Sequence, residues 1–327
     1  MKQSASMGVR MVRLAVFGAV LALFPSAGAK QLKVLAIGNS FSLSMMEELP
    51  KAAAAFPGCE LDIVNMYIGG CPLERHWANV ESNAVDASFR PYDIRASYAF
   101  DRKEMPKRAN IPEMLTADRW DIVTIQQASS KSPFCETYQP FADKLIAKIR
   151  ELAPQAEIRI QETWSYSPYS RTLSKLKMTP ESMYEALHGA YGKLASKYGF
   201  RVIPTGTAVQ LYRHRLPVRY GTPLTPEEIA AIPKPGLVDF CGDVAGSSVW
   251  KKGRKRDADR KEVKLRLDAE HLNAEGKYLQ ACVWLAALFD VDVTKLAYEP
   301  AFKDFAGKAA LMRQCAAEAT KVRVVCR

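Results

Sequence analysis

The chain has 327 residues, of which 48% are hydrophobic and 25% charged, with a formal net charge of +11. This balance is typical of a soluble protein with one large α/β core and excludes a chain built of membrane spans. No CxxC pair occurs and there are only four histidines, which leaves little material for a zinc cluster. Neither GxGxxG nor GxxxxGK(S/T) follows any predicted strand, which argues against nucleotide binding.

The first 29 residues have the order of a secretory signal. Three basic residues precede the apolar run LAVFGAVLALF at 14–24, and small residues follow up to Ala29. A retained anchor is the alternative, but a membrane-spanning helix needs roughly 20 apolar residues. We therefore expect export to the periplasm or the extracellular space, without stable membrane insertion after cleavage. The seven cysteines would permit disulfides there, with at least one left over.

Short apolar runs followed by turns predict the strands of a parallel sheet. The first run, at 32–38, ends at Gly38 and is expected to be the central strand. Further strands are predicted at 61–68, 121–126, 156–163 and 200–205, and helices near 44–55, 138–152, 180–198 and 274–289. This alternation indicates βαβ units with helices on both faces. Ligand sites in such sheets lie beyond the carboxyl ends of the strands.

Two segments interrupt the alternation. Residues 74–118 are rich in charged and aromatic side chains, and residues 206–266 are rich in proline and contain the basic run KKGRKR at 251–256. Neither has enough periodic apolar sequence for its own core, so both are predicted to be insertions around the site. The basic run is interpreted as a solvated loop rather than a nucleic-acid site. Without the signal the charge is about +8, which would suit an acidic polysaccharide.

Two motifs at opposite ends of the chain carry candidate catalytic residues. GNSFS at 38–42 follows the first strand and presents Ser40 close to a helix start, where backbone N–H groups are free, although Gly-Asn-Ser is also a common turn. Asp268 and His271 lie three residues apart, just before an apolar helix that Asn273 could cap. A carboxylate and an imidazole at this spacing can share a hydrogen bond that stabilises the imidazolium. We expect Ser40 to be the nucleophile, His271 the base and Asp268 its partner.

This order of motifs resembles that of the SGNH (GDSL-like) hydrolases, in which the nucleophile follows the first strand and a DxxH motif precedes the last helix. Here GNSFS stands where most members have GDS. The resemblance implies a three-layer α/β/α sandwich with a flavodoxin-like parallel sheet, ester hydrolysis, and neither a metal nor an organic cofactor. We assign residues 30–300 to this domain and 301–327 to a C-terminal helical tail.

The segment NMYIGGCPLERHW at 65–77 resembles the second block of the family. By this resemblance, Gly70 aligns with the glycine whose backbone N–H lines the oxyanion hole. A plain Gly-Gly turn is the alternative interpretation.

The third block of the family usually reads GxND, and its asparagine donates a hydrogen bond to the oxyanion. This chain instead has IQQASS at 125–130. An ungapped alignment places Ser130 at the asparagine, whereas an amide donor can come only from Gln126 or Gln127. A QxxS pattern, here Gln126 and Ser129, resembles that of an uncharacterised branch that also begins with GNSFS. We favour Gln127 as the third oxyanion donor.

Aromatic and basic residues follow the second and fourth predicted strands. Trp77 and Trp164 could stack on a sugar ring or pack under loops, and Arg75 could hold an acidic substrate or pair on the surface. We expect hydrolysis of short acyl esters, most simply acetyl esters, on a small molecule or a polysaccharide that can be anionic. The alternatives are a glycan O-acyltransferase with the same residues and a non-catalytic carbohydrate-binding protein on a degenerate hydrolase fold. No nucleic-acid partner is expected.

Overall fold

A computed structural model describes residues 29–216, 223–252, 261–302 and 305–321. Nearly all of the predicted signal and most of the basic run therefore lie outside the described residues. No helix within the described ranges is long and apolar enough to cross a membrane. The six cysteines in these ranges form no disulfide with one another.

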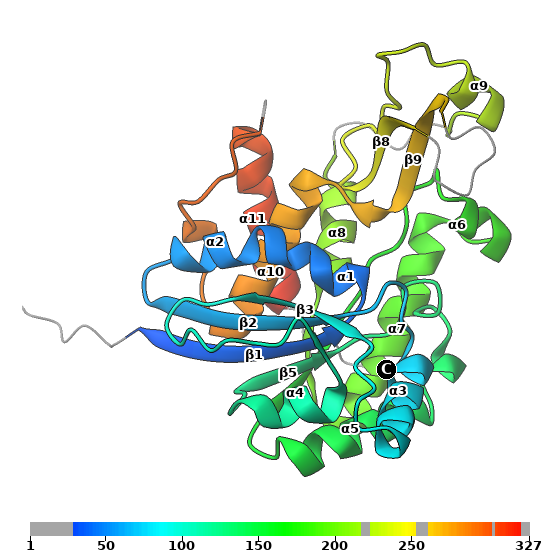
Figure 1. Ribbon diagram of the computed structural model, residues 1–327. Coiled ribbons are helices and arrows are strands. Elements are labelled where there is room, and N and C mark those ends of the chain that lie inside the picture. The colour runs from blue at the N-terminus through cyan, green and yellow to red at the C-terminus, as the bar shows by residue number, and fades with distance from the viewer. Residues whose placement is uncertain (1–28, 217–222, 253–260, 303–304, 322–327) are drawn as a thin grey trace, which may run out of the picture.

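A seven-stranded sheet of order β4-β3-β2-β1-β5-β6-β7 forms the middle layer (Figure 1). Its five parallel strands are the predicted ones: β1 (Lys30–Gly38), β2 (Cys59–Tyr67), β5 (Ile122–Ile125), β6 (Glu157–Gln161) and β7 (Arg201–Ile203). The central strand β1 is apolar without alternation because it is covered on both faces, and its residues Val34 to Ile37 are buried.

Helices cover both faces of the sheet, as the three-layer prediction requires (Figure 1). One layer consists of α1 (Ser40–Leu43), η1 (Ser44–Glu47), α2 (Leu49–Ala54), α8 (Thr205–His214), α10 (Ala274–Phe289) and α11 (Ala306–Lys321). The other contains α3 (Leu73–Val85), α4 (Ile111–Ala117), α5 (Phe141–Leu152) and α7 (Pro180–Tyr198). Helix α10 is apolar all round because α2, α8 and α11 pack against it. Short elements complete the description: η2 (Cys135–Thr137), α6 (Arg171–Leu176), α9 (Pro226–Ala230) and η3 (Val293–Lys295).

The segment 74–118 extends the sheet. Besides α3 and α4 it contains β3 (Tyr92–Ser97), antiparallel to β2, and β4 (Arg108–Ala109), antiparallel to β3. These two strands were not predicted from the sequence. They are short and partly exposed, so they lack the continuous apolar run by which the parallel strands were found.

The segment 206–266 contains α8, α9 and most of a hairpin formed by β8 (Ala245–Lys252) and β9 (Val263–Leu272). This hairpin pairs with no strand of the main sheet and stands apart from it in Figure 1. Strand β9 continues past residue 266 to Leu272 and therefore carries Asp268 and His271. The hairpin belongs to the candidate site as well as to the insertion.

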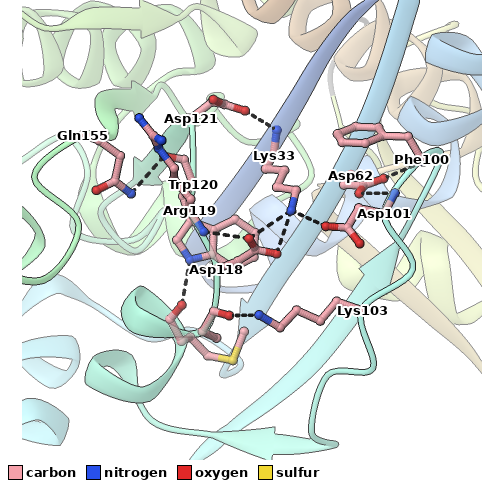
Figure 2. Close-up of polar contacts among 12 residues, drawn as sticks. Lys33, Asp62, Phe100, Asp101, Lys103, Asp118, Arg119, Trp120, Asp121 and Gln155 are labelled. Carbon is pink, nitrogen blue, oxygen red and sulfur yellow. Dashed lines mark hydrogen bonds and ion pairs between the residues drawn. The ribbon is translucent and has the colours of Figure 1, made fainter.

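A charged cluster ties the amino-terminal half of β1 to the segment that follows β3 (Figure 2). The Lys33 ammonium pairs with Asp118 at 3.0 Å and also with Asp101. The buried Asp62 carboxylate of β2 accepts the successive backbone N–H groups of residues 99–101 at 2.6–3.1 Å. Their contacts stabilise the fold. Since Lys33 and Asp62 lie toward the starts of β1 and β2, the cluster is remote from the carboxyl end of β1.

Candidate active site

Ser40 is the first residue of helix α1, directly after the turn that ends β1. The Asn39 side chain caps this helix by accepting the Phe41 N–H at 3.0 Å. Gly38 is required at the turn because a Cβ there would lie 2.3 Å from the Ser42 hydroxyl oxygen. At this first helical position the Ser40 N–H has no intrahelical acceptor, so it is available to a ligand.

A continuous chain of hydrogen bonds joins Ser40, His271 and Asp268. His271 Nε2 lies 2.8 Å from Ser40 Oγ, and its Nδ1 lies 2.8 Å from Asp268 Oδ2. The second carboxylate oxygen accepts the backbone N–H groups of Glu270 and His271 at 3.1 and 3.0 Å. The structure thus brings together the three residues predicted as base, nucleophile and orienting acid, in the order required for nucleophilic catalysis.

The hydrogen bond between Asp268 and His271 favours the charged form of each side chain. Burial disfavours the ionised form of Asp268, but the hydrogen bonds from the His271 ring and from two backbone N–H groups outweigh it, and the pKa of Asp268 is well below its usual value. The hydrogen bond with Asp268 raises the pKa of His271, against the opposing effect of burial. An imidazolium formed by proton transfer from Ser40 would therefore be stabilised. The site is open, since the side chains of Asp268 and His271 are 45% and 41% exposed.

Trp164 follows β6 and is 0% exposed. Its ring stacks on Phe41 with the ring centroids 4.0 Å apart, and Phe41 in turn lies 5.4 Å from the His271 ring. The indole N–H donates to the Glu270 carbonyl at 2.9 Å. The suggestion that Trp164 stacks on a sugar is therefore wrong, because its ring is fully buried and stacks on Phe41 instead. It supports the base instead.

Gly70 lies in the turn after β2, exposed and with φ of +60°. The Cys71 N–H donates to the Ile68 carbonyl at 3.3 Å and closes this turn, while the Ile68 N–H reaches the Gly38 carbonyl at 3.5 Å beside the nucleophile. Within the described part of the chain, no backbone hydrogen bond outside helices and strands uses the Gly70 N–H. It is thus free for the predicted role in an oxyanion hole.

The amide of Gln127 is fully used inside the fold. Its oxygen accepts the N–H groups of Leu73 and Ala128 at 3.0 and 2.8 Å, and its NH₂ donates to the carbonyl and hydroxyl oxygens of Thr137 at 3.0 and 3.2 Å. The side chain is buried. With both amide hydrogens engaged, Gln127 fixes the start of α3 against η2 and has no hydrogen to offer an oxyanion.

The other third-block candidates, Gln126, Ser129 and Ser130, differ in whether they keep a hydrogen that could be donated to an oxyanion. Gln126 Nε2 donates to Asn39 Oδ1 at 2.6 Å, which uses one of its two hydrogens. Ser129 Oγ accepts the Tyr166 hydroxyl at 2.8 Å and keeps its own hydrogen. Ser130 is exposed. Gln126 and Ser129 therefore replace Gln127 as the better candidates for a third donor.

The two residues of α3 predicted to contact substrate, Arg75 and Trp77, make no hydrogen bond with the triad among the described residues. Arg75 is exposed on the first turn of the helix. Trp77 is half-buried between α3 and α5, where its N–H donates to Glu81 at 2.5 Å and the Lys144 ammonium lies 5.2 Å from its ring centroid. Trp77 therefore contributes to packing between two helices.

A buried ion pair that no sequence motif indicates anchors the base of the hairpin. Arg213 of α8 makes a bidentate contact with Asp243 at 3.0 and 3.1 Å, and both side chains are excluded from solvent. The same guanidinium donates to Ser165 at 2.6 Å. The Asp243 carbonyl accepts from the side chain of Asn273, which caps α10 as predicted by accepting the Gly276 N–H.

The candidate site can be compared with known proteins. Residues 33–216 match the family described as a domain of unknown function, DUF4886. A crystal structure of a DUF4886 family protein from Bacteroides uniformis is similar, with 27% identity, 89% of this chain and 95% of that chain covered, and a TM-score of 0.68.

Two further solved structures match more weakly. One, from Slackia heliotrinireducens, is provisionally described as an SGNH hydrolase (16% identity, 79% and 100% covered, TM-score 0.45). The other, from Parabacteroides merdae, is provisionally described as a GDSL-like lipase (13% identity, 79% and 95% covered, TM-score 0.40). No curated protein matches the chain. Because the matched family segment covers more than half of its length, the protein belongs to the DUF4886 family.

Proposed function

We propose that the protein is an exported serine esterase that hydrolyses short acyl esters, most simply acetyl esters, on carbohydrate. The observation that carries this proposal is the unbroken chain from Ser40 Oγ through the His271 ring to the Asp268 carboxylate, with 2.8 Å at each step. Its support in the sequence is the order of motifs typical of SGNH hydrolases and a leader with the features of a secretory signal.

In the proposed reaction, Ser40 Oγ attacks the ester carbonyl while His271 Nε2 accepts its proton. The N–H groups of Ser40 and Gly70 stabilise the oxyanion of the tetrahedral intermediate, assisted by Gln126 or Ser129. The intermediate collapses to an acyl-Ser40 ester as His271 protonates the leaving alcohol. A water molecule, deprotonated by His271, then releases the acid and restores Ser40.

The openness of the site supports a small acyl group on a large alcohol. The side chains of the base and the acid are more than one third exposed, so an ester on a bulky alcohol can approach the triad from solvent. Lys251, Lys252 and Lys261 are exposed at the far end of the hairpin, which favours an anionic polymer.

The first test is hydrolysis of p-nitrophenyl acetate and butyrate by residues 30–327. Ser40→Ala and His271→Ala are compared with Ser196→Ala, an exposed serine of α7, as the matched control. We expect kcat to fall at least about 10³-fold in the two triad variants at unchanged thermal stability, and to be unaffected in Ser196→Ala. A folded wild-type protein without activity on these esters and on acetylated polysaccharides would refute the esterase and favour a non-catalytic carbohydrate-binding protein.

The same exposure supports one alternative within catalysis. A solvent-accessible acyl-Ser40 could be attacked by a glycan hydroxyl instead of water, which makes the protein an O-acyltransferase. Product analysis with an added oligosaccharide separates the two, because only the transferase yields acylated sugar in proportion to the ester consumed.

A further inference from the structure

We propose that Asn39 is a positioning residue of the active site and that its carboxamide, rather than an isosteric carboxylate, is required to hold the Gly70 turn beside Ser40. This inference rests on the proposed function and extends it to a residue that touches neither the substrate nor the reacting atoms.

Asn39 is 1% exposed and uses both ends of its amide. Its oxygen accepts the Phe41 N–H at 3.0 Å and Gln126 Nε2 at 2.6 Å, and its nitrogen donates to the Cys71 carbonyl at 3.1 Å. A backbone N–H can only donate and a carbonyl can only accept. The orientation of the amide is therefore fixed by its neighbours, and the orientation of Gln126 follows from it.

These three bonds join three strand ends at one buried side chain. Asn39 follows β1, Cys71 closes the turn after β2, and Gln126 follows β5. The donated bond is the one that matters for the oxyanion hole. The turn runs from Ile68 to Cys71 and is closed by the Cys71 N–H, which donates to the Ile68 carbonyl at 3.3 Å. Asn39 holds Cys71, the last residue of this turn, and thereby positions the preceding residue, Gly70.

Aspartate at this position would keep the shape of the side chain and its two accepted bonds. An ionised carboxylate has no hydrogen, however, so it would face the Cys71 carbonyl oxygen and repel it in a buried setting. The turn would move away, and the Gly70 N–H with it. Asn39→Asp would create the GDS sequence that most SGNH hydrolases have, and we nevertheless expect it to impair this enzyme.

The test compares Asn39→Asp and Asn39→Ser with Asn110→Asp. Serine at 39 can still cap α1 but is too short to reach Cys71. Asn110 is a matched control because it is also a buried helix cap, accepting the Glu113 N–H at 2.8 Å, and lies before α4 away from the site. Aspartate caps as well as asparagine does.

Steady-state kinetics with p-nitrophenyl acetate and thermal unfolding are measured for each variant. Loss of one oxyanion donor typically costs about 10²–10³ in kcat. For a displaced donor we expect kcat to fall about 10- to 100-fold in both Asn39 variants, with KM within about 3-fold of wild type and no change in Asn110→Asp.

Two outcomes would overturn the inference. One is a kcat of Asn39→Asp within about 3-fold of an active wild type, which would leave the esterase proposal intact. The other is a loss in both Asn39 variants that appears only as unfolding or as a raised KM, which would indicate a purely structural role. A folded wild type without any turnover would instead count against the proposed function itself.

Discussion

The ion pair at the base of the hairpin offers a quantitative test of how the site is held. Arg213→Met removes both hydrogen bonds to Asp243 and the bond to Ser165, and leaves a carboxylate in a fully buried position. Removal of one partner of a buried pair costs about 3–5 kcal/mol, because the remaining charge is uncompensated. That is a large part of a typical stability of about 5–15 kcal/mol. At about 2–4 °C per kcal/mol, the Tm should fall by about 10 °C.

Arg215, two residues further along, provides the matched control. It pairs with Glu318 at 2.6 Å, but the two side chains are 36% and 48% exposed. Exposed pairs contribute about 0–1 kcal/mol, so Arg215→Met should change the Tm little. Urea unfolding followed by far-UV circular dichroism gives the free energies. The double variant Arg213→Met/Asp243→Leu should regain at least half of the loss, since no charge is left unpaired. Equal stability of Arg213→Met and wild type would refute the reasoning.

Three further predictions concern the site itself. His271 accepts a proton only when it is neutral, and its pKa is raised above 6.5, so kcat/KM should rise with pH through a transition centred above that value. In Asp268→Asn this transition should move to lower pH and kcat should fall about 10³–10⁴-fold. A transition that stays at the same pH would contradict the assignment. Trp164→Phe removes the buried hydrogen bond to the Glu270 carbonyl and should cost about 1–3 kcal/mol in urea unfolding, with lower kcat. An unchanged midpoint would show that the bond contributes nothing. In Gly70→Ala the new Cβ meets no atom within 4 Å, so the expected cost is backbone strain of about 1–2 kcal/mol from the positive φ. We expect kcat to fall and KM to stay unchanged, and a rise in KM alone would argue against an oxyanion role.

The parallel sheet could be predicted from sequence because burial on both faces leaves a mark that is local. Strand β1 is a continuous apolar run, and α10 is apolar on all sides for the same reason. The Asn273 cap is likewise a local signal, since its acceptor role is filled three residues later at Gly276. Strands β3 and β4 were missed because they have only six and two residues, too few for such a run.

Side-chain roles in the site were harder to predict because they depend on partners distant in the sequence. Gln127 and Gln126 are adjacent and chemically identical, yet Thr137 occupies the amide of the first and Asn39 that of the second. Trp164 is covered by residues more than a hundred positions away, which no sequence pattern around it records. The pairing of Ser40 with His271 was found only because each belongs to a motif with its own local spacing.

The distance along the chain between the nucleophile and its base has a consequence for how activity arises during synthesis. Ser40 and His271 are 231 residues apart, and the hairpin that carries the base is anchored to α8 and α10. During amino-terminal-first synthesis, β1, β2 and β5 can pair long before residue 271 exists. A partly synthesised chain, or one truncated before β9, would present a serine without a base. Catalytic competence would then appear last in maturation and report on the completed polypeptide.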